Sequence, residues 1–175
     1  MKRKASPKFC IALTVFSLIG QIAWVVENMY LNVFMYKMFN ASAGDISLMV
    51  SASAVAATLT TGFMGSFSDK IGKRKIFMCF GYVLWGVSIL AFALLQKDLI
   101  AAVIPQTLSA ATVGVTLTIL LDCLMTFFGS TANDAAFNAW LTDSTDDTNR
   151  GAAEGINAMM PLVAILVVFG GFMSF

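Results

Sequence analysis

Histidine is missing from the 175-residue chain, so the sequence offers no imidazole for a metal site or for acid–base or nucleophilic catalysis. Cysteine is scarce: the three cysteines lie in or beside apolar runs without paired spacing, which favours a packing role. The chain also lacks a phosphate-binding glycine loop, a nucleophile–base pair and a basic patch for nucleic acid. We therefore expect no enzyme, no cofactor, no metal site and no nucleic-acid partner.

Charge is equally sparse, at 12% of residues, whereas 58% are hydrophobic. A soluble domain carries about a quarter charged residues and could not bury so much apolar surface. Several runs reach the roughly 20 apolar residues that a helix needs to cross a bilayer. The sequence predicts an all-α integral membrane protein with five spans, at about residues 9–36, 46–67, 76–95, 110–131 and 156–175.

The basic residues predict the orientation of these spans, because lysine and arginine are enriched on the cytoplasmic side. Only Lys37 and Lys97 fall on the opposite side from the other lysines and arginines. The N-terminus and the loops at 68–75 and 132–155 are therefore predicted to be cytoplasmic in a multi-pass protein of the cell membrane. The basic residues on that side are Lys2, Arg3, Lys4, Lys8, Lys70, Lys73, Arg74, Lys75 and Arg150.

One short loop, "GSFSDKIGKRK" from Gly65 to Lys75, gathers charge between two apolar runs. Positive-inside anchoring explains its basic residues but not the placement of its glycines and aspartate. Asp69 can pair with a nearby arginine or cap a neighbouring helix, and Gly72 permits a tight reversal of the chain. Gly65 continues a row of small residues that would let another helix approach closely; the others are Ser51, Ala54, Thr58 and Gly62.

This loop resembles the signature G-x-x-x-D-[RK]-x-G-[RK]-[RK] of the major facilitator superfamily, at the family's position between the second and third helices. The resemblance implies a secondary transporter of twelve helices in two six-helix halves, with the substrate site between the halves. In that family the signature latches the two halves together when the cytoplasmic side is closed. The latch residues carried over to this sequence are Gly65, Asp69, Lys70, Gly72, Lys73 and Arg74.

The resemblance covers the whole chain, but only the first five of the twelve expected helices. The odd number of spans favours an incomplete N-terminal half of an ion-coupled transporter that moves a small solute by alternating access. The expected partners are that solute, H⁺ or Na⁺, the lipid bilayer and a missing C-terminal half that would carry the surface opposite the latch. The alternative is a stand-alone short membrane protein with a structural, sensing or assembly role.

Polar residues within the first span form one face, since Gln21, Trp24, Asn28 and Asn32 recur every three or four positions. Glu27 lies at the edge of that face. Ionisable groups inside a bilayer are costly, so we treat each as a candidate for substrate binding or ion coupling. Glu27 is the leading candidate for proton coupling; the alternative is an interhelical hydrogen bond near the outer surface.

The fourth span carries a second polar face, formed by Asp122, Thr126, Gly129 and Asn133 and followed by Asp134. Asp122 lies deep in an apolar stretch, where it must pair across helices, stay protonated or line a cavity. We predict a coupling or substrate-binding role for Asp122. Asp134 lies about 18 Å further along the helix and is predicted to belong to a cytoplasmic gate.

The stretch from Trp140 to Gly151 is similar to a loop of the glycoside–pentoside–hexuronide:cation symporters, a branch of the superfamily, with the pattern W-x-x-D-x-T-x-x-x-x-R-G. The resemblance adds Asp143 and Arg150 to the gate network. The alternative is a solvated loop whose threonines and aspartates cap short helices. Members of this branch often carry two aspartates in the second helix, but Thr58–Gly65 has none, which argues against their sodium coupling and against a sugar substrate.

Overall fold

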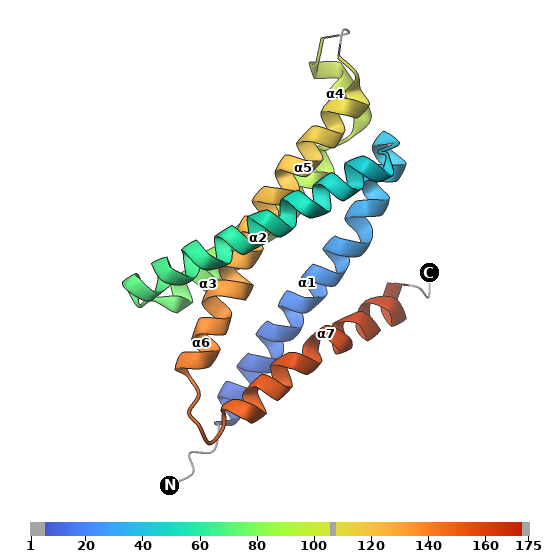
Figure 1. Cartoon of the computed structure of the whole chain (residues 1–175). Coiled ribbons are helices and arrows are strands. Elements are labelled where there is room, and N and C mark those ends of the chain that lie inside the picture. Colours follow the sequence, from blue (N-terminus) through green and yellow to red (C-terminus); the bar gives the residue numbers. More distant parts are fainter. Residues whose placement is uncertain (1–5, 106–107, 173–175) are drawn as a thin grey trace. The chain divides into compact units, whose positions relative to one another are not determined.

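The computed structural model describes residues 6–105 and 108–172, and nearly all of these residues are helical (Figure 1). Lys2, Arg3 and Lys4, which contribute to the predicted orientation, and residues 173–175 of the fifth predicted span lie outside the described residues. The α-helices are α1 (Pro7–Phe39), α2 (Ala43–Ile71), α3 (Arg74–Ala91), α4 (Lys97–Val103), α5 (Ala110–Gly129), α6 (Asn138–Asp143) and α7 (Arg150–Phe172). A 3₁₀-helix, η1 (Phe92–Leu94), follows α3, and a π-helix, η2 (Ser130–Phe137), follows α5.

Within the described residues, five helical stretches are long and apolar enough to cross a membrane. Large apolar side chains cover their outer faces, as at Phe63 and Leu90, which are 74% and 73% exposed. Such exposure suits lipid as the surrounding solvent. The chain is therefore a multi-pass membrane protein, as the hydropathy predicts. The five stretches are Pro7–Phe39, Ala43–Ile71, Arg74–Leu94, Ala110–Asp143 and Arg150–Gly171.

Helix boundaries differ from the predicted ones mainly after the fourth span. The loop predicted at 132–155 is helical except at 144–149, because η2 and α6 continue the helix to Asp143. Polar residues lower the hydropathy there, while buried apolar side chains such as Phe137 and Leu141 still favour a helix. The loop predicted at 68–75 likewise contracts to Gly72 and Lys73. The apolar segment before Pro105 forms the short helix α4.

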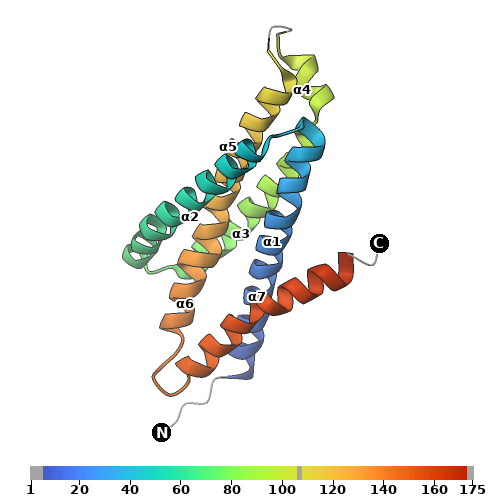
Figure 2. The same ribbon diagram turned by 45° about the vertical axis from the view of Figure 1, so that its right-hand side comes forward.

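Residues 31–136 form one compact unit, in which α5 packs against both α2 and α3 (Figures 1 and 2). Small residues allow the close approach of helices there, as is common in membranes. Gly81 of α3 faces Ala132, at a point where a side chain on Gly81 would meet the backbone of η2. Gly129 faces the ring of Trp85, which is only 2% exposed. Glycine thus sets the distance between α3 and the α5–η2 stretch.

Residues 6–30 and 137–172 belong to the second compact unit, which contains the first part of α1 together with α6 and α7. The Ser17 hydroxyl of α1 donates a hydrogen bond of 2.5 Å to the Asn157 side-chain oxygen of α7. Nearer the start of α1, the ring of Phe9 lies 5.3 Å from that of Trp140. These contacts hold α6 and α7 beside α1 in this unit.

Candidate functional site

The charged loop that the sequence singles out is a tight turn between α2 and α3. Gly72 has a φ of 68°, in the left-handed region where glycine is favoured, and its N–H donates to the Ser68 carbonyl at 2.9 Å. This cap ends α2 at Ile71 and lets α3 begin two residues after the glycine. The turn therefore returns Arg74 to the last turn of α2.

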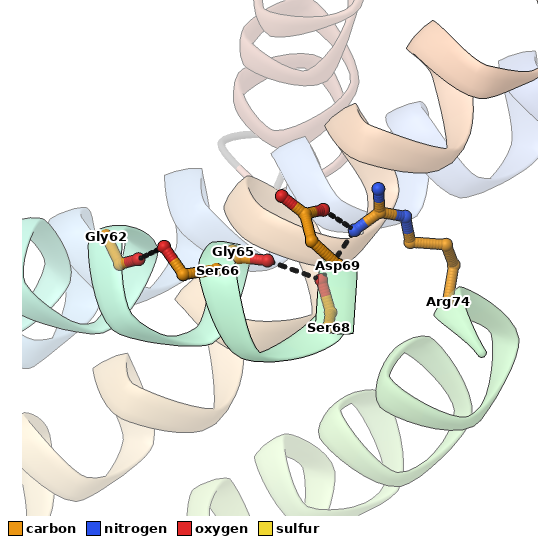
Figure 3. A network of polar contacts seen from close by, with 6 residues as sticks. All are labelled: Gly62, Gly65, Ser66, Ser68, Asp69 and Arg74. Atoms are coloured by element: carbon orange, nitrogen blue, oxygen red, sulfur yellow. Dashed lines mark hydrogen bonds and ion pairs between the residues drawn. The ribbon is translucent and has the colours of Figure 1, made fainter. Parts of the chain in front are cut away.

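Arg74 makes two contacts with that turn, which Figure 3 shows. Its guanidinium forms an ion pair with Asp69 and donates to the Ser68 hydroxyl at 2.7 Å. The Ser68 hydroxyl in turn donates to the Gly65 carbonyl at 2.9 Å. Arg74 and three of the other predicted latch residues, Gly65, Asp69 and Gly72, thus lie together around one helix end.

The exposure of the two charged side chains in this cluster differs sharply. The Arg74 side chain is 17% exposed, whereas the Asp69 side chain is 62% exposed. An ion pair with so exposed a member contributes about 0–1 kcal/mol to stability. The carboxylate of Asp69 is therefore fixed in position by Arg74 while most of its surface stays accessible to another group.

The small-residue row of α2, comprising Ser51, Ala54, Thr58, Gly62 and Gly65, leads along the helix to this cluster. Its first four members are exposed, and among the described residues nothing would lie within 4 Å of a Cβ atom on Gly62 or Gly65. The hydroxyls of Ser51 and Thr58 donate to carbonyls of their own helix, each at 2.8 Å. The row is thus a smooth helix face with satisfied polar groups.

Asp122 of α5 is buried, with 2% of its surface exposed, and the Ser53 hydroxyl of α2 donates a hydrogen bond to its carboxyl group. This hydrogen bond joins α2 to α5, and the three expectations for the charge of Asp122 stay predictions. Ser53 was missed at the sequence level, where the only signal was a hydroxyl within an apolar span. A buried carboxyl group with a neutral donor suits a protonated acid or a bound cation, because an uncompensated charge is costly there.

A second polar cluster joins α3 to η2. The Tyr82 hydroxyl donates to the Asn133 side-chain oxygen at 3.2 Å, and the Asn133 amide donates to the Asp134 carboxyl group at 3.2 Å. Asn133 is 5% exposed, while Asp134 is partly exposed. Asp134 is thus a partly exposed residue between buried neighbours, and Tyr82 is a partner that the sequence did not suggest.

The polar face of α1 is only partly buried. Gln21, Trp24, Glu27 and Asn32 are of intermediate exposure and Asn28 is exposed. The Asn28 amide donates to the Trp24 carbonyl at 2.8 Å, so its donor is used within the helix. One carboxyl oxygen of Glu27 is buried. A coupling role for Glu27 stays a prediction.

Arg150 caps α6. Its guanidinium donates to the Thr142 carbonyl at 3.1 Å and to the Thr145 hydroxyl at 3.4 Å. These contacts satisfy polar groups at the end of α6, and both the gate role of this loop and its alternative stay predictions. Asp143 ends α6 in the same compact unit, whereas Asp134 belongs to the other, so the gate network of all three residues stays a prediction.

These features define a helical membrane protein with a charged turn between its second and third spans and a buried carboxyl group in its fourth. A comparison with protein-family models matches residues 9–175 to the Major Facilitator Superfamily. The chain belongs to the Major Facilitator Superfamily, whose members move small solutes across membranes. Comparisons with curated proteins and with solved structures give no significant match.

Proposed function

We propose that the chain forms the N-terminal part of a secondary active transporter that moves a small solute by alternating access and couples this movement to an ion. Family membership supports the transport function, and the five membrane-crossing helices fit the first five of the superfamily's twelve. The excess of basic residues around the α2–α3 turn supports a cytoplasmic position for that turn and for the N-terminus.

The observation that carries the proposal is the geometry of the α2–α3 turn. Asp69 is positioned by Arg74 but remains 62% exposed, at the end of a helix face lined with small residues. A carboxylate in this position can accept hydrogen bonds from, or pair with, a helix end of a second half each time the cytoplasmic side closes. Gly72 forms the turn, the Gly65 carbonyl accepts from Ser68, Lys70 lies in the last turn of α2 and Lys73 precedes Arg74 at the start of α3.

Ion coupling is proposed to depend on Asp122, with Glu27 as a second carboxyl group. Asp122 is buried and its observed partner is a serine, so its charge state affects how α2 and α5 pack. The pattern from Trp140 to Gly151 favours a position near the glycoside–pentoside–hexuronide branch. Because Thr58–Gly65 of α2 contains no carboxylate, we assign the ion-coupling carboxyl group to α5.

The test is uptake of a panel of small polar solutes into vesicles that contain the full-length protein, driven by an imposed proton or sodium gradient. We expect gradient-dependent accumulation of at least one solute. D69N, which keeps the shape of the side chain but removes its charge, should slow this uptake about tenfold or more without reducing membrane insertion. D98N is the matched control, since Asp98 is an exposed carboxylate in the first turn of α4.

Normal uptake by D69N would refute the latch. No accumulation of any solute under either gradient would refute the transport assignment and favour a stand-alone structural or sensing role.

A further inference from the structure

Every fourth residue from Thr118 to Asp134 carries a hydroxyl or a carboxyl group. Thr118, Asp122, Thr126 and Ser130 are 0%, 2%, 1% and 0% exposed. Between Thr118 and Phe127 the exposed positions carry large apolar side chains, such as Leu120, which is 62% exposed. Residues four apart lie on one side of a helix, so these groups form a buried polar row inside the unit of residues 31–136.

Hydroxyls in membrane helices commonly donate to a carbonyl of their own helix, and this accounts for some of those in α5 and η2. The Thr118 hydroxyl donates to the Gly114 carbonyl and the Thr131 hydroxyl to the Phe127 carbonyl, each at 2.7 Å. Thr126 behaves differently. Its hydroxyl is buried and makes no hydrogen bond within the described residues. A buried polar group of this kind calls for an explanation, and it lies between two carboxyl groups.

The two ends of the row differ in environment. Asp122 receives the Ser53 hydroxyl from α2 and has Cys123 as its ionisable neighbour along the chain. Asp134 is partly exposed and lies beside Ser130, Asn133 and the Tyr82 side chain of α3. The ionisable residues of α4, which also packs against α5, are Lys97 and Asp98 in its first turn. One end is thus buried, whereas the other is partly exposed.

The π-helix keeps the last member in line with the row. In an α-helix of 3.6 residues per turn, each step of four residues advances by about 40° around the axis. A π-helix has more residues per turn than an α-helix. The step of four residues from Ser130 to Asp134 within η2 therefore does not add the rotation around the axis that it would add in an α-helix. Short π segments occur frequently at functional sites.

We propose that Asp122, Thr126, Ser130 and Asp134 form a proton path, by which the coupling proton passes between the buried Asp122 carboxyl group and the side of the membrane on which Asp134 lies. The inference rests on the proposed function and names its coupling ion. Successive members are about 6 Å apart along the axis, a separation that one bridging water molecule between two oxygen atoms can span. The proton leaves the Asp122 O–H, each hydroxyl and water accepts one proton as it releases another, and the Asp134 carboxylate receives one.

Sodium is the competing ion, since Asp122, Ser53 and Thr126 all supply oxygen atoms. The proton is favoured because a row of hydroxyls that continues to a second carboxyl group can relay protons.

The test follows the Asp122 proton directly and needs no knowledge of the transported solute. The full-length protein is reconstituted with its cytoplasmic face outward in vesicles of phosphatidylethanolamine and phosphatidylglycerol. A rapid rise in external pH should then remove the infrared carbonyl band of the protonated Asp122 side chain. That band is assigned by its loss in D122N or, if D122N does not insert, by its shift in D122E.

We expect T126V to slow the loss of this band about tenfold or more, because valine matches threonine in shape but lacks the hydroxyl. T126S, which restores the hydroxyl, should return the rate to that of the unsubstituted protein. T131V is the matched control, since Thr131 is a neighbouring buried threonine whose hydroxyl is bound to its own helix. S130A should slow the step as well.

Equal rates for T126V and T131V would overturn the path, and so would an Asp122 band that does not respond to pH. A band that disappears on addition of sodium chloride at constant pH would assign Asp122 to sodium and overturn the inference. None of these results depends on solute uptake, so each can be separated from a failure of the proposed transport function.

Discussion

Replacing Gly81 with alanine tests the close packing of α3 against η2. A Cβ atom at this position would lie 2.7 Å from the Cβ of Ala132, and 3.1 and 3.2 Å from the backbone N and Cα of that residue. Carbon atoms pack best at about 3.5–4.0 Å, so the helices must separate by about 1 Å or strain. Backbone atoms cannot rotate away as a long side chain would.

The matched control is G86A, one position beyond Trp85 on α3. Gly86 is exposed, and nothing in the described chain lies within 4 Å of the position that its Cβ would take. Both variants gain the roughly 0.8–1 kcal/mol by which alanine favours a helix over glycine. Only G81A also bears the overpacking cost of about 1–3 kcal/mol. The difference between the two variants therefore isolates the contact with η2.

Thermal unfolding in detergent, followed by tryptophan fluorescence, measures this difference. Trp85 is a suitable reporter because it packs on Gly129 in the same interface. For a chain of this size each kcal/mol shifts the Tm by about 2–4 °C, so G81A should unfold about 2–12 °C below G86A. Equal Tm values would show that α3 and η2 separate without cost, and would refute the claim that Gly81 sets their distance.

Two further predictions concern the unit of residues 6–30 and 137–172. S17A removes the hydrogen bond to Asn157 and should lower the free energy of unfolding by about 0.6–1 kcal/mol. S66A is the control: the exposed Ser66 hydroxyl donates to its own helix, so this variant should leave the Tm unchanged. R150K cannot reproduce both guanidinium contacts, so amide hydrogen exchange over 144–149 should accelerate. Unchanged exchange there would contradict the capping role of Arg150.

The membrane spans could be predicted from the sequence because a bilayer imposes a minimum apolar length on any helix that crosses it. The pairing of Asp69 with Arg74 could also be predicted, because a single tight turn separates the two residues and Gly72 marks that turn. Both predictions depend on local sequence. The end of the fourth helical stretch was harder, because residues 132–143 keep a helical pattern while losing the hydropathy of a span.

The partner of Asp122 could not be predicted, because Ser53 lies 69 positions away and α2 contains several other hydroxyls. Only the rotation of α2 about its axis against α5 selects Ser53, and side-chain packing over the whole interface sets that rotation. The same limit applies to Thr126. Its polar character is visible in the sequence, but the absence of a bond to its own helix depends on the backbone around it.

The hydroxyls along the exposed face of α2 have a consequence for the proposed alternating-access cycle. Ser51, Thr58 and Ser66 donate to carbonyls one turn earlier in their own helix, so they need no bond from whatever covers them. When a second surface leaves this face, no polar group is left unsatisfied in lipid, and when it returns no bond has to be broken first. Such a face can bind and release a second surface many times with little change in free energy.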